Sequence, residues 1–473
     1  MNDAATRSDG HDVIVIGAGP AGMAAASTTA TAGLRTLIVD EGQGPGGQIY
    51  RAITSSPHRD RSILGDDYWA GAALPKELEA SGAAALYGAS VWTLDRDLAV
   101  GVSTGGVSQL MSARRVIVAT GAMERPFPIP GWTLPGVMTA GAAQTLLKSS
   151  GIVPGGRIVL AGVGPLLWLL AAQLLRSGAP ISAVLDTGSR AALLRAAPFV
   201  AVFVLSPYRA KGLALMREVR GGTRVISGVT RLAALGSGRL EAVDVGHGGR
   251  TERLEADHLL LHQGVVPNVN LAMAAGVEHR WHGERLCFEP VLGEAGRSTV
   301  PGILIAGDGA GIGGAQAAEV RGRIAGAAVV RELAPGALTR LPDEQVLRND
   351  LARAERGRRF LDLLFMPQQA MRIPTGDTIV CRCEEVTADE VRQSIENGAM
   401  GPNQLKAFRR TGMGPCQGRL CGLTVTELVA QERDRSPAET GYYRIRPPVK
   451  PIPLAEIADM PVTEADTRTV VRG

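Results

Sequence analysis

Apolar residues in this chain come in short runs separated by glycine-rich turns. Clear examples are residues 13–16, 36–39, 116–119 and 181–185. Runs this short and this uniformly apolar predict parallel strands that are buried on both faces. Alanine-rich stretches between them predict the helices that cover such a sheet. The pattern therefore predicts an α/β protein.

Composition agrees with a globular α/β protein and excludes other classes. The length of 473 residues suggests about three domains, and 45% of the residues are apolar. A net charge of +4 is too small to indicate nucleic-acid binding. The polar, acidic N-terminus lacks the basic and apolar regions of a signal peptide. We therefore expect a cytoplasmic protein and no nucleic acid among its partners.

One stretch, residues 158–175, is apolar enough to be mistaken for a membrane span. It contains Gly162, Gly164 and Pro165, which are typical of a turn. We therefore expect a buried strand, a turn and a helix here.

The first predicted strand runs directly into the sequence G-x-G-x-x-G. Gly17 is expected to form the tight turn, Gly19 to let the backbone approach a pyrophosphate, and Gly22 to let the helix pack closely on the strand. The helix N-terminus then faces the phosphates. Asp40 ends the next strand, where an acid can bind a ribose hydroxyl pair. A simple glycine-rich turn is the alternative, but the ordered strand, turn, helix, strand and acid predict dinucleotide binding.

Three further motifs accompany this turn. They are a Gly-Gly-Gln sequence after the acid, a strand that ends in Ala-Thr-Gly, and a later strand that ends in Gly-Asp before a Gly/Ala-rich helix start. With the turn, they resemble the glutathione-reductase-like flavoproteins with two dinucleotide domains. The resemblance implies FAD at the first turn and a helix N-terminus aimed at the flavin ring. The FAD contacts it implies are Gly17, Gly19, Pro20, Ala21, Gly22, Asp40, Glu41, Gly47, Gln48, Val91, Ala119, Thr120, Gly121, Gly307, Asp308, Gln316 and Ala317.

A second turn follows Arg157 and carries Gly162 and Gly164, but Leu167 occupies the third glycine position. The resemblance places the nicotinamide cofactor of NAD(P)H-dependent relatives at this turn. A leucine there is expected to crowd the helix–strand contact or to push the turn outward. Asp186 still ends the next strand. The fold is therefore expected to survive, whereas NAD(P) binding is not expected.

No catalytic residue is assigned in this chain. Disulfide reductases of the resembled superfamily carry a Cys-x-x-Cys pair beside the flavin, but the first cysteine here is Cys287, which we expect to be a small buried hydrophobe. His262 ends a predicted strand and could face the flavin, although a structural role is the expected one. No Ser-His-Asp set, carboxylate pair or histidine cluster occurs.

The other four cysteines lie together late in the chain, as Cys381-Arg-Cys383 and Cys416-Gln-Gly-Arg-Leu-Cys421. In a cytoplasmic protein such grouping favours a metal over disulfides. A capping box at residues 387–390 predicts one helix, and residues 402–410 and 423–431 suggest two more. We therefore expect both cysteine pairs at helix starts or in tight loops.

Free backbone N–H groups at these positions would stabilise a net-negative cluster. Arg382 and Arg419, which lie between the cysteines of each pair, are expected to do the same.

Zinc is the competing interpretation, because four cysteines suit tetrahedral Zn²⁺. Zinc sites usually use C-x-x-C, which neither pair has. The module resembles the bacterioferritin-associated-ferredoxin-like domain, although C-x₄-C replaces the C-x-x-C of the simple ferredoxin. That variant is similar to the form fused to flavoprotein subunits of amine dehydrogenases. The resemblance implies one [2Fe–2S] cluster on Cys381, Cys383, Cys416 and Cys421; zinc and free thiols remain alternatives.

The predicted domain order has six parts. They are an FAD-binding domain (1–125), a degenerate second Rossmann domain (126–255), a return to the FAD domain (256–330), a helical linker (331–375), the cysteine module (376–440) and a Pro-rich extended tail (441–473). We expect the tail to lie across a domain or partner surface. The order resembles the alpha subunits of multi-subunit amine-oxidising dehydrogenases, a group that includes opine oxidase, proline and hydroxyproline dehydrogenases, hydrogen cyanide synthase and sarcosine oxidase.

The resemblance implies a division of labour between subunits. A beta subunit with its own FAD would oxidise the C–N bond of an amino-acid-derived secondary amine. This chain would relay the electrons through FAD and [2Fe–2S] to a small-molecule acceptor. A small third subunit and a membrane contact made through the partners are compatible with that arrangement.

Three other functions compete with this one. One is glycine oxidation in a hydrogen cyanide synthase, and another is a stand-alone NAD(P)H-dependent reductase, against which Leu167 argues. The last is a non-catalytic iron-handling protein, against which the intact FAD fingerprint argues.

Overall fold

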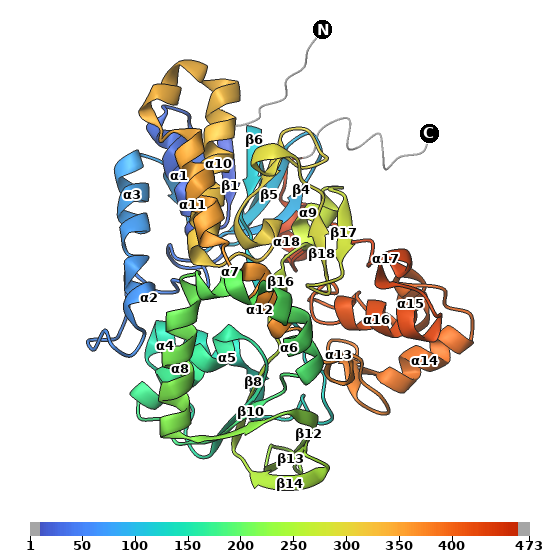
Figure 1. The fold of residues 1–473 in the computed structure, drawn as a ribbon. Helices are drawn as coiled ribbons and strands as arrows, with labels where there is room; N and C mark the ends of the chain where they lie inside the picture. The colour runs from blue at the N-terminus through green and yellow to red at the C-terminus, as the bar shows by residue number, and fades with distance from the viewer. Residues whose placement is uncertain (1–9, 462–473) are drawn as a thin grey trace.

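The short apolar runs form the strands of two separate sheets, with the cysteine module beside them (Figure 1). The computed structural model describes residues 10–461. The two sheets belong to two α/β domains, and a chain of short helices leads from them to the module. The expected α/β class is therefore confirmed.

The first domain contains a seven-stranded sheet in the order β3-β2-β1-β6-β5-β4, with β19 paired to β6. The strands are β1 (His11–Ile16), β2 (Thr36–Val39), β3 (Ala84–Leu86), β4 (Ser90–Leu94), β5 (Ala99–Thr104), β6 (Val107–Val118) and β19 (Ile303–Ile305). The parallel strands β3, β2, β1, β6 and β19 bring the first turn, the Ala-Thr-Gly end and the Gly-Asp end to the same edge.

Helices α1 (Pro20–Thr31) and α10 (Ala315–Leu333) pack against each other beside this sheet, and α2 (Asp66–Ala70) and α3 (Ala73–Ser81) belong to the same domain. The contact between α1 and α10 is close because glycines of α10 face small residues and backbone of α1. A Cβ on Gly322 would overlap the carbonyl oxygen of Ala21, and a Cβ on Gly326 would lie 2.9 Å from Thr28. The two helices that begin at the site therefore form one rigid unit.

The second domain contains a five-stranded sheet in the order β11-β10-β9-β15-β8 and a three-stranded antiparallel sheet. The strands of the first are β8 (Val137–Thr139), β9 (Ile158–Gly162), β10 (Ile181–Asp186), β11 (Arg224–Ser227) and β15 (His258–His262); those of the second are β12 (Val229–Leu235), β13 (Ala242–His247) and β14 (Arg250–Glu255). The helices are α4 (Ala140–Ser150), α5 (Pro165–Arg176), α6 (Arg190–Ala196), α7 (Val200–Val204) and α8 (Tyr208–Gly222). Residues 158–175 thus form β9, a turn and most of α5, as expected.

The expected domain boundary at residue 256 is wrong. Strand β15 pairs in parallel with β9 and β8, so it belongs to the sheet of the second domain. The chain crosses back only in β16 (Val265–Pro267), which pairs with the outgoing β7 (Ala122–Glu124). An apolar run predicts a strand but does not say which sheet the strand will join.

The return segment continues with α9 (Asn270–Ala274) and the hairpin of β17 (His279–His282) and β18 (Cys287–Pro290). Cys287 is buried on β18, as expected. The linker starts slightly later than residue 331, because α10 continues to Leu333. It then forms α11 (Glu344–Ala354), α12 (Arg358–Leu364) and α13 (Gln369–Arg372). The expected helical linker is therefore present.

The cysteine module contains the three helices that the sequence predicts. They are α14 (Ala388–Glu396), α15 (Pro402–Arg409) and α16 (Gly422–Glu432), preceded by β20 (Ile379–Cys381) and β21 (Val386–Thr387) and followed by α17 (Pro437–Thr440) and α18 (Leu454–Ala458). The side chains of Thr387 and Glu390 form the expected capping box at α14. Cys381 ends β20, and Cys383 lies in the turn that follows, so this pair lies at a tight loop.

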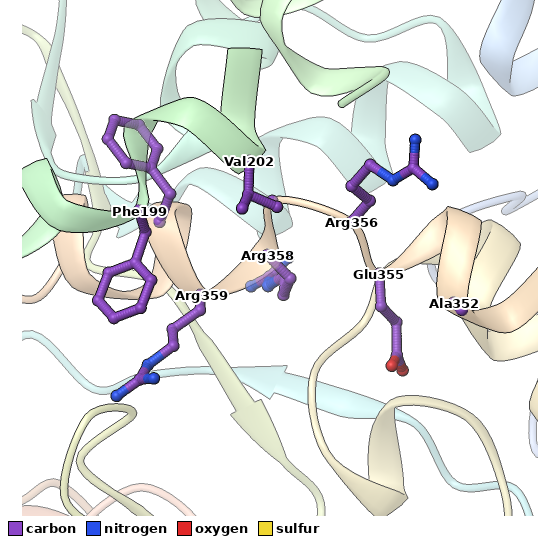
Figure 2. A pocket seen from close by; sticks show the side chains of 9 residues that line it. Phe199, Val202, Ala352, Glu355, Arg356, Arg358 and Arg359 are labelled. Carbon is purple, nitrogen blue, oxygen red and sulfur yellow. The ribbon is translucent and has the colours of Figure 1, made fainter. Parts of the chain in front are cut away.

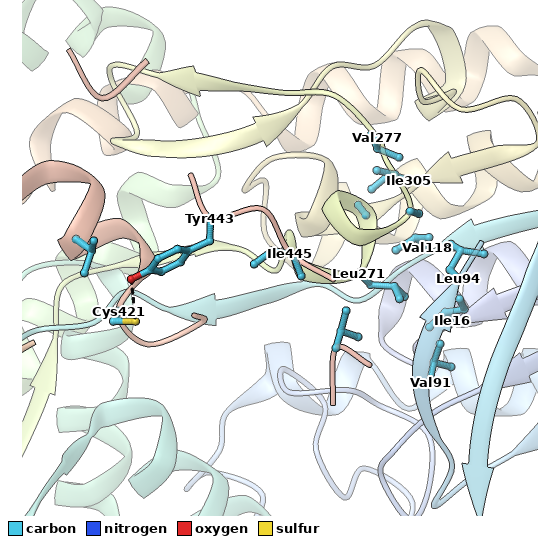
Figure 3. Close-up of a cluster of buried hydrophobic side chains, with 14 of the residues drawn as sticks. Ile16, Val91, Leu94, Val118, Leu271, Val277, Ile305, Cys421, Tyr443 and Ile445 are labelled. Carbon is cyan, nitrogen blue, oxygen red and sulfur yellow. Dashed lines mark hydrogen bonds between the residues drawn. The ribbon is translucent and has the colours of Figure 1, made fainter. Parts of the chain in front are cut away.

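One hydrophobic core runs from the first domain into the cysteine module. It includes Ile16 and Val118 of the sheet, Leu271 of the return segment, and Cys421 and Tyr443 of the C-terminal part (Figure 3). A continuous core of this kind makes the module an integral part of the first domain.

Among residues 10–461, no single helix is long and apolar enough to cross a membrane. One sharply bent pair, Arg190–Val204 with Tyr208–Gly222, meets the length and composition criteria only when the two are taken together.

Candidate functional site

A cavity of about 2240 Å³ lies between the two domains and reaches the cysteine module. Single small-molecule pockets usually measure roughly 300–1,000 Å³, so this cavity has room for a dinucleotide and a further molecule. All but two of the predicted FAD contacts line it. The exceptions are Gly22 and Ala317, which are buried behind it.

The first turn has the geometry that each glycine predicts. Gly17 has a φ of +105°, which favours glycine. A Cβ on Gly22 would overlap the carbonyl oxygen of Gly17, so only glycine allows α1 to lie this close to β1. A Cβ on Gly19 would meet only the Cα of Gly47, at 3.9 Å, and would otherwise project into the cavity. The wall at Gly19 is therefore free for a ligand to approach.

Two helix N-termini of the first domain open onto the cavity. Neither α1 nor α10 has a side chain that caps its first turn. Their first N–H groups, which have no partner within a helix, are therefore available to an anion. Together they fit a pyrophosphate-containing ligand.

Two carboxylates hold the loops around these helix starts. Asp40 accepts the N–H of Ala18 at 2.5 Å and the N–H of Gly42 at 2.7 Å. Asp308 accepts the N–H of Gly313 at 2.8 Å and of Gly314 at 3.0 Å, just before α10. A carboxylate oxygen can accept more than one hydrogen bond, so both groups can still accept from hydroxyls of a ligand.

Sequence reasoning missed several basic residues that line the same cavity. They are Arg51, Lys148, Arg419 and Lys450. The Nε of Arg51 is buried and has no hydrogen-bond partner among the described residues. An unpaired buried guanidinium nitrogen is costly, and a phosphate oxygen would satisfy it. Arg51, Lys148 and Lys450 carry no local sequence signal, because they reach the site from distant segments; Arg419 stands out in the sequence only by its position between two cysteines.

Lys148 extends from α4 of the second domain to the loop after Asp40. Its Nζ donates to the carbonyl of Ile49 at 2.9 Å, to that of Gln48 at 3.3 Å and to the side chain of Gln144 at 2.9 Å. Burial, with a smaller contribution from Arg51, lowers the pKa of Lys148 to about 7. The lysine therefore joins the second domain to the loop that carries Gln48.

The second turn keeps its shape but differs in what surrounds it. Leu167 is fully buried in the core of the second domain, where its side chain packs in the contact between the helix and the sheet. Gly162 and Gly164 have φ values of +139° and +130°. A Cβ on Gly164 would lie 3.0 Å from Nε2 of His262. An imidazole thus occupies the side of the turn that a pyrophosphate would need.

His262 and Glu124 form a buried pair at this end of the cavity. Nδ1 of His262 lies 2.7 Å from a carboxylate oxygen of Glu124, and the other oxygen accepts the N–H of Gly141 at 2.8 Å. The pair fixes the ring against the second turn. It is the one arrangement along this cavity that resembles an acid–base dyad among the described residues, whereas the sequence predicts a structural role for His262.

The four late cysteines form two close pairs. Cys421 hydrogen-bonds to Cys381, which lowers the pKa of Cys381 to about 6 and raises that of Cys421. Cys383 likewise interacts with Cys416, and burial raises the pKa of Cys383. The Cys421 sulfur also lies 3.7 Å from the hydroxyl of Tyr443 (Figure 3). Within residues 10–461, no three His, Cys, Asp or Glu side chains converge as the ligands of a single metal ion would.

Both arginines between the cysteines make contacts that the sequence did not predict. The guanidinium of Arg382 lies over the ring of Trp132, 5.9 Å from its centroid. The Nη1 of Arg419 donates to the carbonyl of Val449 in the C-terminal tail, at 3.1 Å. Each arginine therefore ties the cysteine module to a different part of the chain.

A smaller recess of about 390 Å³ lies where the linker meets α7 (Figure 2). Two of its arginines are engaged within the chain: Arg358 donates to Asp362 at 2.7 Å, and Arg359 pairs with Glu284 at 2.6 Å and stacks on Phe199. The recess therefore resembles a linker contact more than a binding site.

The fold and the two-turn cavity define an oxidoreductase with two dinucleotide domains, and comparisons with known proteins agree. Residues 11–327 match the pyridine nucleotide-disulphide oxidoreductase family, and residues 375–460 match the sarcosine oxidase A3 domain. The chain is 47% identical to the opine oxidase A-type subunit of Agrobacterium tumefaciens (strain Ach5), over 98% of this chain and 94% of that protein. It is 30% identical to hydrogen cyanide synthase subunit HcnB of Pseudomonas aeruginosa, over 94% of this chain and 98% of that one.

The fold has a solved counterpart in L-proline dehydrogenase from P. horikoshii. The TM-score is 0.71 and the identity 20%, and the match covers 94% of this chain and 79% of that one. The chain belongs to the pyridine nucleotide-disulphide oxidoreductase family and, within it, to the group of opine oxidase A-type subunits. Membership in that family implies FAD.

Proposed function

We propose that this chain is the FAD- and [2Fe–2S]-containing electron-transfer subunit of a heteromeric dehydrogenase that oxidises an opine-like secondary amine. The amine is oxidised on a partner subunit that carries its own flavin. This chain then passes the electrons to a small-molecule acceptor.

The observation that carries the proposal is the meeting of the two candidate cofactor sites. Arg419 and Leu420, which lie between Cys416 and Cys421, line the same cavity as Gly19 and Asp308. A bound flavin takes up electrons in pairs and releases them singly, and an iron–sulfur cluster carries one at a time. Electron transfer between two such groups requires that they lie close together, and a cavity lined by residues from both candidate sites supports that arrangement.

The first turn fits FAD through groups already described. Gly19 leaves the wall open, the starts of α1 and α10 offer free N–H groups, and Arg51 has a buried donor without a partner among the described residues. Asp40 and Asp308 retain the capacity to accept hydrogen bonds from hydroxyls. All of these groups suit a long ligand with a negatively charged centre and hydroxyls on both sides.

The cysteine arrangement supports [2Fe–2S] over zinc. A tetrahedral zinc ion needs its four ligands around one point, whereas a binuclear cluster needs two thiolates on each iron. The two loops supply two thiols each, Cys381 and Cys383 from one and Cys416 and Cys421 from the other, and no three His, Cys, Asp or Glu side chains of the described residues converge on a single ion. Cys421 also precedes α16, which no side chain caps, so free N–H groups lie near its sulfur.

The substrate class and the partner rest on the relatives. Their names describe subunits of opine oxidase, at 47% identity, and of hydrogen cyanide synthase, at 30%; the higher identity favours an opine. Exposed apolar side chains on α6 to α8 support a heteromer, because an interface with another subunit would cover them. They are Leu193, Leu194, Val200, Val202, Val204, Leu205 and Leu213.

Purification of the chain alone and together with its partner tests the proposal. The chain alone should carry noncovalent FAD and stoichiometric iron, give the low-temperature EPR signal of a reduced [2Fe–2S] centre, and not oxidise opines. Opine oxidation should appear when the partner flavoprotein is present. Stoichiometric zinc without iron, or opine turnover by the chain alone, would contradict the proposal.

A further inference from the structure

The C-terminal tail runs from the cysteine module across the first domain. We define the strap as residues 444–456. At its start, the Nζ of Lys406 donates to the carbonyl of Arg444 at 2.8 Å, and the N–H of Arg444 donates to Asn403 at 2.7 Å. At its end, the carboxylate of Glu456 accepts the hydroxyls of Ser103 at 2.5 Å and Ser108 at 2.8 Å. The strap is therefore fixed to the module at one end and to β5 and β6 at the other.

Between these anchors the strap passes the end of the cavity where Asp40 lies. The N–H of Val449 donates to the carbonyl of Trp92 at 2.8 Å, next to Val91, a predicted FAD contact. Val449 and Lys450 both line the cavity. The Nζ of Lys450 pairs with the carboxylate of Glu41. Burial lowers the pKa of Lys450, and the nearby Asp40 opposes that shift.

A continuous set of contacts thus connects the cysteine loop to the dinucleotide groove. The N–H of Arg419 bonds to the carbonyl of Cys416 at 3.1 Å, and its guanidinium bonds to the carbonyl of Val449. The next residue, Lys450, reaches Glu41, and Glu41 follows the ribose-binding position Asp40. A shift of the 416–421 loop would therefore move the segment that closes the groove.

We infer that the strap closes the adenosine end of the dinucleotide groove, with Lys450 and Arg419 as positioning residues that make cofactor retention depend on a filled cysteine site. Lys450 orients Glu41 beside the ribose position. Arg419 transmits the state of the cysteine loop to Val449. The inference rests on the proposed binding of FAD and iron.

The first test measures FAD affinity in the full chain. Apoprotein would be titrated with FAD, followed by quenching of flavin fluorescence. Lys450→Gln and Arg419→Gln should each raise the Kd about ten-fold, because each loses one hydrogen bond to or from a charged group. Lys450→Arg should restore most of the affinity. Arg446→Gln is the matched control, since it also removes a positive charge, at an exposed position of the strap that lies outside both cysteine pairs.

The second test measures the coupling. Cys383→Ser should empty the iron site without removing any contact to the strap, and it should weaken FAD binding several-fold. In the Arg419→Gln background the same change should have little further effect, because the link is already broken. Reciprocally, protein stripped of FAD should lose iron to a chelator faster than the holoprotein does.

The outcomes separate this inference from the proposed function. A wild-type chain that holds no FAD would overturn the proposed function itself. A wild-type chain that holds FAD no better than Lys450→Gln and Arg419→Gln would overturn only the strap, as would an equal loss in Arg446→Gln. If Arg419→Gln fails to fold, the comparison of Lys450→Gln with Lys450→Arg still decides whether the positive charge of Lys450 contributes to FAD affinity.

Discussion

The two glycine turns share the same order of strand, turn and helix but differ in the groups that lie next to their second glycine. In the first turn, the wall at Gly19 is open and the N–H of Ala18 is held by a carboxylate, Asp40. In the second turn, the side of Gly164 is taken by the ring of His262, and the N–H of Val163 donates to a backbone carbonyl at 2.8 Å. The two turns thus differ in what lies beside their second glycine, which is the open cavity at Gly19 and an imidazole at Gly164.

The difference teaches that a turn motif and a binding site are separate properties. Pro20 and Pro165 begin the two helices in the same way, and both helices run for 12 residues. Asp186 ends its strand as Asp40 does, but burial raises the pKa of Asp186, and its carboxylate bonds to Gly188 instead of the turn. The second turn therefore keeps the backbone arrangement of the first, but the ring of His262 lies against its second glycine.

The largest effect on cofactor binding is expected from adding a side chain at the first turn. Gly19→Val should abolish FAD binding while the protein folds normally. Gly19 has an ordinary φ of −74°, and an added side chain meets nothing but the Cα of Gly47 before it enters the cavity. The check is flavin absorbance after gel filtration, with circular dichroism to confirm the fold.

Gly155→Val is the control for this change, because Gly155 is exposed and an added Cβ meets nothing within 4 Å. That variant should keep its full flavin content. Equal flavin in wild type and Gly19→Val would show that the dinucleotide does not approach the first turn as proposed.

A smaller effect, on stability instead of FAD binding, is expected from restoring the third glycine of the second turn. Leu167→Gly should destabilise the fold by about 2–5 kcal/mol, the usual cost of removing a fully buried leucine side chain, without creating an NADH site. His262 would still stand beside Gly164. Chemical denaturation gives the stability, and anaerobic mixing with NADH shows whether the flavin bleaches. Rapid bleaching of the wild-type flavin by NADH would contradict the comparison, since it would show that the second turn binds despite its occupant.

Local signals explain how much of this architecture could be predicted. The strand–turn–helix units, the degenerate state of the second turn and the capping box of Thr387 and Glu390 each depend on residues close in sequence. How the fold accommodates Leu167 could not be predicted, because the surroundings of this side chain come from other segments. The same reason explains the boundary near β15, where pairing with β8 and β9 decides the sheet.

The site was predictable only where its residues lie in motifs. Nearly all of the fingerprint positions meet at one cavity, as the order of strand ends implied. Lys148, Arg419 and Lys450 reach that cavity from other domains, through contacts to backbone carbonyls or to a single carboxylate. Such contacts depend on the finished fold and carry no spacing in the sequence. The pairing of Cys381 with Cys421 is likewise a product of folding.

The smallest expected effect concerns pH, and it tests whether the two domains are joined at the first turn by Lys148. The pKa of this lysine is about 7 in the folded chain, against an ordinary value of 10.5. Between those values the unfolded chain binds a proton here that the folded chain does not, so stability should rise with pH across this window. The slope contributed by one group is at most about 1.4 kcal/mol per pH unit. Below pH 7 both states are protonated, and the contribution becomes constant.

Lys148→Met should remove this slope. The free energy of unfolding of the wild type should therefore rise relative to that of the variant as the pH increases from about 7 towards 10. Denaturant titrations over that range measure it, with Lys76→Met, at an exposed position on α3, as the control. Parallel pH profiles for wild type and Lys148→Met would show that the lysine is not buried against the carbonyls of Gln48 and Ile49. Lys148 would then not link the second domain to the loop that follows the first turn.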